Sequence, residues 1–418
     1  MASLSSCVFP LEIISLILDE LTDRYDYRVL CSCRLVCKTF ESLATPHVFR
    51  VLILSENEDS RAAFSNIAEH SRLALLVKTI EFTYVDLEPD DDVYGGSYLD
   101  NGTAFSQIFH IWPNAPAFLT EEIGNISDIF LNLPRLPNLE KLLCDFPGEF
   151  ANCDAIGCGA SRSLSLQSKM FERFGECYNT SASQEENGCS IATANSRGIG
   201  EDSDSTLQIQ NKSQLRSIKL EGIVPVAHGH GRGLRSTGLG LPVFFQSIQT
   251  MDLSLQVEEF NEAFYGSHSY LDFWRTDMRN LMFMMTSSLT SLSLSNNVKT
   301  VGFDCPTWDS LTFPSLLYLH LSSIVFNDHE FFNQQETGVE AFILRHAPTL
   351  QHLVLSECLL NLGADPRDVP VTPGTRTWDD IFQSFNEKLA VKSFTFTPIP
   401  ELAKAEGYVS WCYYGCYL

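Results

Sequence analysis

Hydrophobic residues in the first fifty positions follow the spacing of amphipathic helices. Behind Pro10, five aliphatic side chains at i, i+1, i+4, i+5 and i+8 predict one helix with a single apolar stripe: Ile13, Ile14, Ile17, Leu18 and Leu21. A second periodic run extends from Val29 to Leu43 and is predicted to close at Pro46. A unit this short rarely buries enough apolar surface to fold alone, so we expect part of that surface to face a partner.

From residue 75 onward a different pattern recurs: an aliphatic residue, two others, a hydrophobe, one other and a second hydrophobe. Each copy predicts a short strand whose fourth and sixth positions point inward. Two helical stretches, at residues 338–347 and 379–389, lie between copies. Tandem strand–helix units must stack on their neighbours to bury their apolar faces. The copies are Val77-Ile80-Phe82, Leu139-Leu142-Cys144, Leu215-Ile218-Leu220, Ile248-Met251-Leu253, Leu289-Leu292-Leu294, Leu316-Leu319-Leu321, Leu350-Leu353-Leu355 and Val391-Phe394-Phe396.

These patterns divide the chain into four parts. Residues 5–50 form the helical unit, and residues 51–146 hold the first repeat-like units. Residues 147–213 are rich in Ser, Gly and Asn and poor in periodic hydrophobes, so we expect most of them to be a disordered insertion. Residues 214–418 carry the remaining units and an aromatic C-terminal segment that we expect to cap the last one.

Composition and net charge limit the kinds of partner and the cellular compartments that we expect for this protein. The 418 residues are 44% hydrophobic, which is typical of a globular protein with a substantial core. A formal net charge of −24 disfavours binding to nucleic acid or to an anionic membrane surface. We find no signal peptide and no apolar run long enough to span a membrane. Thirteen scattered cysteines suit reduced thiols, so we expect a cytoplasmic or nuclear protein.

Candidate chemistry in the sequence is sparse. No nucleophile, phosphate-loop or metalloprotease motif is present, and we expect no catalytic residue. The loop at residues 228–233 offers two histidines without further ligands, so we read it as a surface loop. Cys31, Cys33 and Cys37 cannot direct three thiolates to one metal from one helix, and we expect them to be buried as small hydrophobes. We expect neither a metal nor a cofactor.

The N-terminal segment also resembles the F-box motif. An opening hydrophobe–Pro pair, an Ile/Leu helix and a Leu-Val-Cys-basic-x-aromatic segment occur in that order, the last at residues 35–40. The resemblance implies docking on the Skp-type linker subunit of a cullin–RING ubiquitin ligase through a helical, apolar interface. Some of the matching positions must pack internally. The positions it assigns to docking are Phe9, Pro10, Ile13, Ile14, Ile17, Leu18, Leu35, Val36, Cys37 and Phe40.

The recurring strand pattern resembles the leucine-rich repeat, in the irregular form that follows many F-boxes of the expanded fungal families. Repeat lengths vary between 27 and 41 residues in the last six copies, and the asparagine that closes the strand turn is mostly missing, with Asn296 and Asn297 the nearest approach. We therefore expect an α/β protein: an all-α F-box bundle followed by an irregular leucine-rich-repeat solenoid. An α/β domain whose strands happen to be rich in leucine is the alternative.

Together the two resemblances imply a non-catalytic substrate-recognition adaptor of an SCF-type ubiquitin ligase, in which the repeats bind a protein substrate. A non-ligase F-box scaffold or regulatory binding module is the alternative. If the strands are parallel, their outward positions form one surface, whose mildly acidic character favours a substrate with some positive charge. The side chains expected there are Lys219, Glu221, Asp252, Ser293, Tyr318, His320, His352 and Thr395.

Overall fold

The computed structural model of the chain describes three stretches of the N-terminal part and a series of segments beyond it. The described residues are 10–23, 27–55, 58–83, 129–130, 132–146, 167, 170, 214–224, 247–256, 273, 278, 287–296, 308, 311–327, 338–361 and 377–399.

Three helices form the N-terminal helical unit: α1 (Leu11–Asp23), α2 (Tyr27–Arg34) and α3 (Lys38–Arg50). Leu18, Leu30 and Ala44 form its buried centre, one from each helix. As predicted, α1 begins directly behind Pro10, whose carbonyl accepts the N–H groups of Ile13 and Ile14.

The prediction of a single second helix between Val29 and Pro46 is wrong in two respects. The chain turns at Leu35 and Val36, so the run is two helices, and Pro46 lies inside α3 and does not end it. The N–H of Val36 donates to the carbonyl of Cys33, which closes this turn. Hydrophobic periodicity continues across a tight turn, which is why the sequence pattern does not reveal it.

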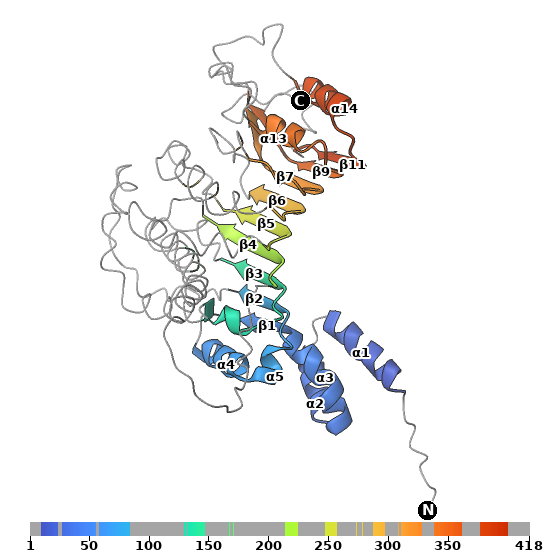
Figure 1. Ribbon diagram of the computed structural model, residues 1–418, viewed down its shortest axis with the longest axis vertical. Helices are drawn as coiled ribbons and strands as arrows, with labels where there is room; N and C mark the ends of the chain where they lie inside the picture. Colours follow the sequence, from blue (N-terminus) through green and yellow to red (C-terminus); the bar gives the residue numbers. More distant parts are fainter. Residues whose placement is uncertain are drawn as a thin grey trace, which may run out of the picture.

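Among the described residues, nine strands form one sheet in which every strand pairs in parallel with its neighbours, and the spatial order follows the chain (Figure 1). All eight copies of the recurring pattern are strands of this sheet. The sequence pattern missed the first strand, β1. The strands are β1 (Val51–Leu54), β2 (Thr79–Thr83), β3 (Lys141–Asp145), β4 (Ser217–Ile223), β5 (Thr250–Leu255), β6 (Ser291–Asn296), β7 (Tyr318–Ser322), β9 (His352–Ser356) and β11 (Ser393–Thr397).

The fourth pattern position is aligned across the whole sheet. Ile80, Leu142, Ile218, Met251, Leu292, Leu319, Leu353 and Phe394 are register partners from strand to strand. All of these except Phe394, on the last strand, are buried. Alternation then places the fourth and sixth positions in the core and the positions between them on the opposite face.

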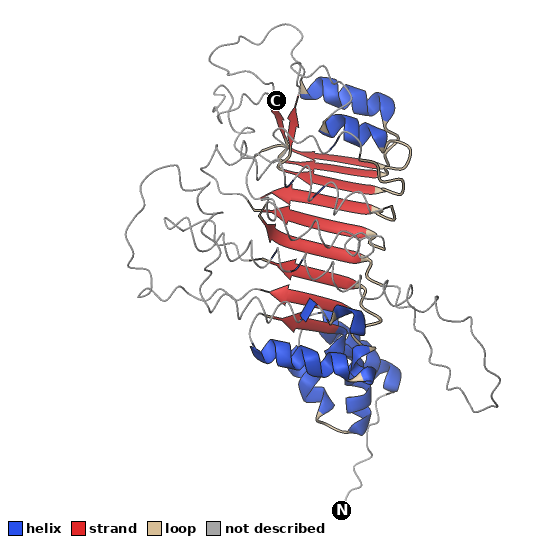
Figure 2. Cartoon of the chain, turned by 60° about the vertical axis from the view of Figure 1, so that its left-hand side comes forward, coloured by secondary structure: helices blue, strands red, loops and turns tan. Residues whose placement is uncertain are grey.

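Helices cover the core face at the two ends of the sheet (Figure 2). Near β1 these are α4 (Glu58–Glu69), α5 (Ser71–Ala74) and the short 3-10 helix η2 (Leu133–Arg135). Near β11 they are α13 (Val339–Arg345) and α14 (Trp378–Lys388), which confirm the two helical stretches predicted there. A second, two-stranded parallel sheet joins β8 (Val325–Asn327) to β10 (Leu359–Asn361).

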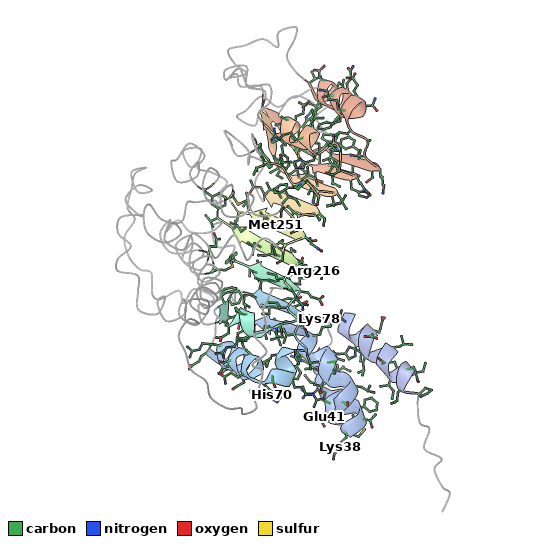
Figure 3. The ribbon with its side chains drawn as sticks, in the orientation of Figure 1. Lys38, Glu41, His70, Lys78, Arg216 and Met251 are labelled. Atoms are coloured by element: carbon green, nitrogen blue, oxygen red, sulfur yellow. The ribbon has the colours of Figure 1, made fainter. Side chains whose placement is uncertain are left out.

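A repeated hydrogen-bond pattern connects successive strands where they begin. The carbonyl of Lys78 accepts two N–H groups, from Glu140 and Lys141, and the carbonyl of Arg216 likewise accepts two, from Gln249 and Thr250. The carbonyls of Glu140, Gln249, Thr290, Leu317 and Gln351 repeat the arrangement toward the next strand. Figure 3 labels Lys78 and Arg216, which lie on the side of the sheet where the strands begin. Each strand therefore enters the sheet in the same local geometry.

The helical unit runs into the sheet without a linker, because α3 ends at Arg50 and β1 begins at Val51. The carbonyl of Arg50 accepts the N–H of Lys78 at 2.9 Å. The carbonyl of Arg50 is thus bonded to the residue before β2, as the carbonyl of Lys78 is bonded to the residue before β3. Phe49 packs against the core of the sheet. Phe49, Leu52 and Leu54 thus repeat the strand pattern, with the last turn of a helix supplying its first position.

Two described residues of the expected insertion lie in the core. Gln167 and Met170 have helical backbone and are buried, and Gln167 holds an irregular turn of β4: its Nε2 donates to the carbonyl of Gly222, and its Oε1 accepts the N–H of Val224. At these two positions the chain is therefore packed. The rest of residues 147–213, and the C-terminal segment expected to act as a cap, lie outside the described residues.

Candidate protein interfaces

One side of α1 carries large aliphatic side chains in solvent. Leu16 is 63% exposed, Ile17 52% and Ile13 42%. These three side chains project away from Leu18 around the helix, since each residue advances the helix by about 100°. Leu18 is 1% exposed, and Ile14 and Leu21 pack beside it. The stripe predicted from the sequence is thus divided: part holds the bundle together, and part faces outward.

The turn between α2 and α3 is a second apolar protrusion. Leu35 is 88% exposed and Val36 67%, the largest exposures among the large hydrophobic side chains that the structure describes. Both side chains sit in a turn, where neither helix can cover them. Burying such side chains in a partner would remove a large apolar area from water, at roughly 25 cal/mol per Å².

Cys37 precedes the first residue of α3, and its thiol is exposed. The N–H groups of Phe40 and Thr39 at the helix start lower the pKa of this thiol. A helix N-terminus favours the negative thiolate in this way. The expectation that Cys31, Cys33 and Cys37 are all buried is wrong, because Cys31 is also exposed and only Cys33 packs against the bundle. Residues two apart on a helix point to different sides.

The residues expected to dock a partner therefore separate into two groups. Ile13, Ile17, Leu35, Val36 and Cys37 are exposed, and Pro10 is exposed at the start of α1. Leu18 is buried, Ile14 and Phe40 are partly buried, and Phe9 lies outside the described residues. Sequence reasoning missed three exposed aliphatic side chains on the same helices: Leu11, Leu16 and Val29. Leu16 lies off the i, i+1, i+4, i+5 and i+8 spacing of the predicted stripe, and its apolar character at an outward position was the available signal.

The second candidate interface is the face of the sheet opposite the helices, here called the open face. All eight residues expected to contact a substrate lie on it, in register. Its central row runs through Ile53, Glu81, Leu143, Lys219, Asp252, Ser293, His320, Val354 and Thr395. Tyr318 and His352 are paired in the row toward the strand starts, and Glu221 pairs with Asp145 in the row toward the strand ends.

Short contacts order the side chains of the open face. The ammonium of Lys219 lies 2.6 Å from Oε1 of Glu221. Oγ of Ser293 and Nδ1 of His320 are 3.3 Å apart, and Nδ1 of His352 and Oγ of Ser393 are 2.7 Å apart. These contacts join neighbouring side chains, so the face presents preformed groups and not independent flexible ones.

Asp252, Ser293 and His320 lie on three adjacent strands, yet they do not form a nucleophile–base–orienter array. Such an array needs the imidazole between the hydroxyl and the carboxylate. Here the order across the register is Asp252, Ser293, His320, so the serine lies between the other two. Burial lowers the pKa of His320, and the nearby charge of Asp252 opposes this only in part. The order of the three side chains therefore does not match the one that acyl transfer needs.

Charge is segregated along the open face. On β2 to β5 its positions include Glu81, Lys141, Asp145, Lys219, Glu221 and Asp252. On β6, β7, β9 and β11 the equivalent positions hold only uncharged residues and the two histidines: Ser291, Ser293, Ser295, Tyr318, His320, Ser322, His352, Val354, Ser356, Ser393, Thr395 and Thr397.

The residues that the structure describes offer neither a metal site nor a membrane-spanning helix. Within these residues no three His, Cys, Asp or Glu side chains are grouped so that they could hold a metal ion. Among the described helices, none has the length and apolar character needed to cross a bilayer.

Comparison with known proteins identifies one region. Residues 7–52 match the F-box domain family, a range that includes all of α1, α2 and α3. The resemblance read from Phe9-Pro10 and residues 35–40 is thereby confirmed for this part of the chain. No curated protein matches the chain.

Proposed function

We propose that this chain is the substrate-recognition adaptor of a cullin–RING ubiquitin ligase, with the helical unit docked on a Skp-type linker subunit. F-box domains in general bind that subunit, and residues 7–52 match such a domain. The observation that carries the proposal is the outward apolar surface of the helical unit: Leu11, Ile13, Leu16, Ile17, Val29, Leu35 and Val36 are each at least 40% exposed. Exposed aliphatic side chains in this number on two short helices and the turn that follows them indicate a protein-binding surface.

We further infer that the sheet is the strand face of an irregular leucine-rich-repeat solenoid. The repeated carbonyl pattern at the strand starts supports this, since each unit contacts its neighbours through the same bonds. A residue with positive φ also follows the last open-face position of three strands: Gly222 on β4, Ser323 after β7 and Glu357 after β9. In this proposal the open face presents the protein to be ubiquitylated, and the chain contributes proximity and no bond chemistry.

The docking proposal is tested by a pull-down of the full chain with purified Skp-type linker subunit. The variant Ile13→Asp/Leu35→Asp places two charges in the exposed apolar surface and should lose binding, because anchors of this kind contribute about 2 kcal/mol or more each. Ile53→Asp is the matched control: Ile53 is 53% exposed but lies on β1, and its variant should bind like the wild type.

Binding that survives in the double variant, or that is lost equally in Ile53→Asp, would contradict the docking proposal. Adding purified cullin subunit to this pull-down distinguishes a ligase adaptor from a non-ligase scaffold. Recovery of the cullin subunit together with the linker supports a ligase adaptor, and recovery of the linker without cullin supports a scaffold.

A further inference from the structure

The strand β11 is exposed at pattern positions that are buried in the earlier strands of the sheet. It comes last in the strand order, at the end of the sheet far from the helical unit, and among the described strands only β9 pairs with it (Figure 1). Phe394 at the fourth position is 41% exposed, whereas its register partner Leu353 on β9 is fully buried. Phe396, at the sixth position, is only partly buried. The core face of the sheet therefore ends in two incompletely covered aromatic side chains.

The helix α14 covers these two rings from one side. The ring of Phe382 lies 5.6 Å from that of Phe394 and 5.0 Å from that of Phe396, centroid to centroid. Phe385 and Trp378 add contacts at 6.2 Å to Phe394 and 5.1 Å to Phe396. Phe394 stays exposed in spite of these contacts. Covering the rest of an aromatic side chain removes a large apolar area from water, so a further layer over β11 is favourable.

The backbone of β11 also points toward its outer edge. The N–H of Ser393 donates to the carbonyl of the residue before β9, and the carbonyl of Thr397 accepts the N–H of the residue after β9. Backbone groups alternate in direction along a strand, so those of Phe394 and Phe396 face away from β9. The strand carries no charged side chain. An uncharged edge of this kind is a template for pairing with another segment.

We propose that the C-terminal segment of this chain, residues 408–418, covers β11 by pairing with its outer edge and packing against Phe394 and Phe396. Ile399 is the last described residue before this segment, so the segment is attached directly beside the exposed edge. Residues 408–418 include five aromatic residues and no charged one, which matches the character of β11. The last unit of a stack of repeats has no neighbour and requires a cap, and this segment supplies it.

The length of the connection sets the direction of pairing. Ten residues, 398–407, join β11 to the segment, and two of them are Pro398 and Pro400. A parallel crossover takes a dozen or more residues, usually with a helix, whereas an antiparallel return needs only a turn. The segment therefore returns antiparallel to β11, which closes the parallel sheet at its end.

Alternation along the segment decides which side chains meet the core. In an extended segment Val409, Trp411 and Tyr413 share one face. These are one aliphatic and two aromatic side chains, so this face lies on the core side, next to Phe394. The opposite face includes Ser410, which joins the serine and threonine hydroxyls of the open face.

Hydrogen–deuterium exchange of the full chain, followed by mass spectrometry, tests the proposal. A peptide containing β11 should exchange slowly in the wild type, because the amides on the outer edge of β11 are hydrogen-bonded to the segment. Trp411→Ser/Tyr413→Ser should speed this exchange about tenfold or more. Tyr408→Ser/Tyr414→Ser is the matched control: it removes two aromatic side chains from the other face of the same segment and should change the exchange by less than about twofold.

A reciprocal pair of variants changes β11 and reads out the segment. Phe394→Asp places a charge where the segment packs, so exchange of residues 408–414 should rise by a similar factor. Thr395→Asp is its control, because Thr395 lies on the open face of the same strand and does not meet the core. Exchange of β9, measured in the same spectra, should stay unchanged in all four variants, which shows that the sheet itself is intact.

Three results would overturn the proposal. The first is rapid exchange of β11 in the wild-type chain, which would leave its edge open to another protein. The second is an equal effect of each variant and its control. The third is slow exchange that becomes rapid on dilution, which would mean that a second copy of the chain covers the edge. None of these results bears on linker docking, because the exposed apolar surface of the helical unit lies at the other end of the sheet.

Discussion

The guanidinium of Arg34 lies over the ring of Phe49, with Cζ 5.0 Å from the ring centroid. Arg34 is the last residue of α2, and Phe49 lies in the last turn of α3, where its ring also packs against the core of the sheet. One aromatic side chain therefore contacts both the helical unit and the sheet. Since no linker separates α3 from β1, this contact helps to fix the orientation of the exposed apolar surface of the helical unit relative to the open face of the sheet.

The first prediction concerns this contact. In a double-mutant cycle with Arg34→Gln and Phe49→Leu, we expect a coupling of about 0.5–1 kcal/mol, because leucine preserves most of the packing but has no π face for the cation. Urea denaturation monitored by circular dichroism measures the four free energies. Additive effects, with a coupling near zero, would mean that the two side chains are neighbours without a favourable interaction.

The second prediction concerns the irregular turn of β4. Gly222 has a φ of +71°, and a Cβ there would lie 2.6 Å from the carbonyl oxygen of Phe146, which is backbone and cannot move aside easily. Gly222→Ala should lower the free energy of unfolding by about 2 kcal/mol or more, from left-handed strain and the clash together. Ser217→Ala, on the open face of the same strand, is the control and should change stability by less than about 0.5 kcal/mol. Similar melting curves for the two variants would contradict this prediction.

The third prediction concerns pH. The imidazole of His346 is buried between α13 and the segment before β7: its Nε2 accepts the N–H of Phe313 at 2.8 Å, and its Nδ1 lies 2.7 Å from the carbonyl of Phe342, to which it donates. Both nitrogens are therefore engaged in the neutral form. Burial lowers the pKa of His346, and the bond to Phe342 opposes this only in part.

A lowered pKa in the folded state means that the unfolded chain binds the proton more readily. Stability contributed by neutral His346 is thus complete above about pH 6.5, the ordinary value for histidine, and is lost as the pH falls below it. His346→Gln can keep one donor and one acceptor without titrating. Between pH 6.5 and 5 its unfolding free energy should fall less steeply than that of the wild type in urea titrations, and parallel slopes would contradict the assignment.

The fourth prediction concerns cysteine reactivity. The pKa of exposed Cys37 is lowered by the start of α3, whereas burial raises the pKa of Cys144 and raises that of Cys358 to about 12. Iodoacetamide at pH 7 should therefore modify Cys37 well before either buried thiol, as followed by mass spectrometry of the digested chain. Linker subunit added beforehand should slow the reaction at Cys37. Labelling of Cys37 that is unaffected by bound linker would place this thiol outside the interface.

Much of the repeat organisation could be predicted from the sequence. A strand buried on one face must alternate, so eight copies of one apolar pattern sufficed to locate eight strands and the residues of the open face. The first strand was missed for a physical reason: its first pattern position is the aromatic Phe49, which belongs to a helix, and β1 is apolar at all four positions and so shows no alternation. The turn at Leu35 and Val36 was missed because helical periodicity continued across it.

The sequence by itself determined which residues are apolar, how they alternate and therefore which face of each strand enters the core. Only the tertiary structure decided which of the apolar side chains are buried, which stay exposed, and which residues become neighbours. The stripe of α1 divides into Leu18 inside the bundle and Ile17 outside it, because packing against two other helices covers only one side of a helix. Asp145, Glu221 and Asp252 are far apart in the sequence and form one cluster only because parallel pairing aligns their strands. Local spacing sets the direction of a side chain, and long-range pairing sets its neighbours.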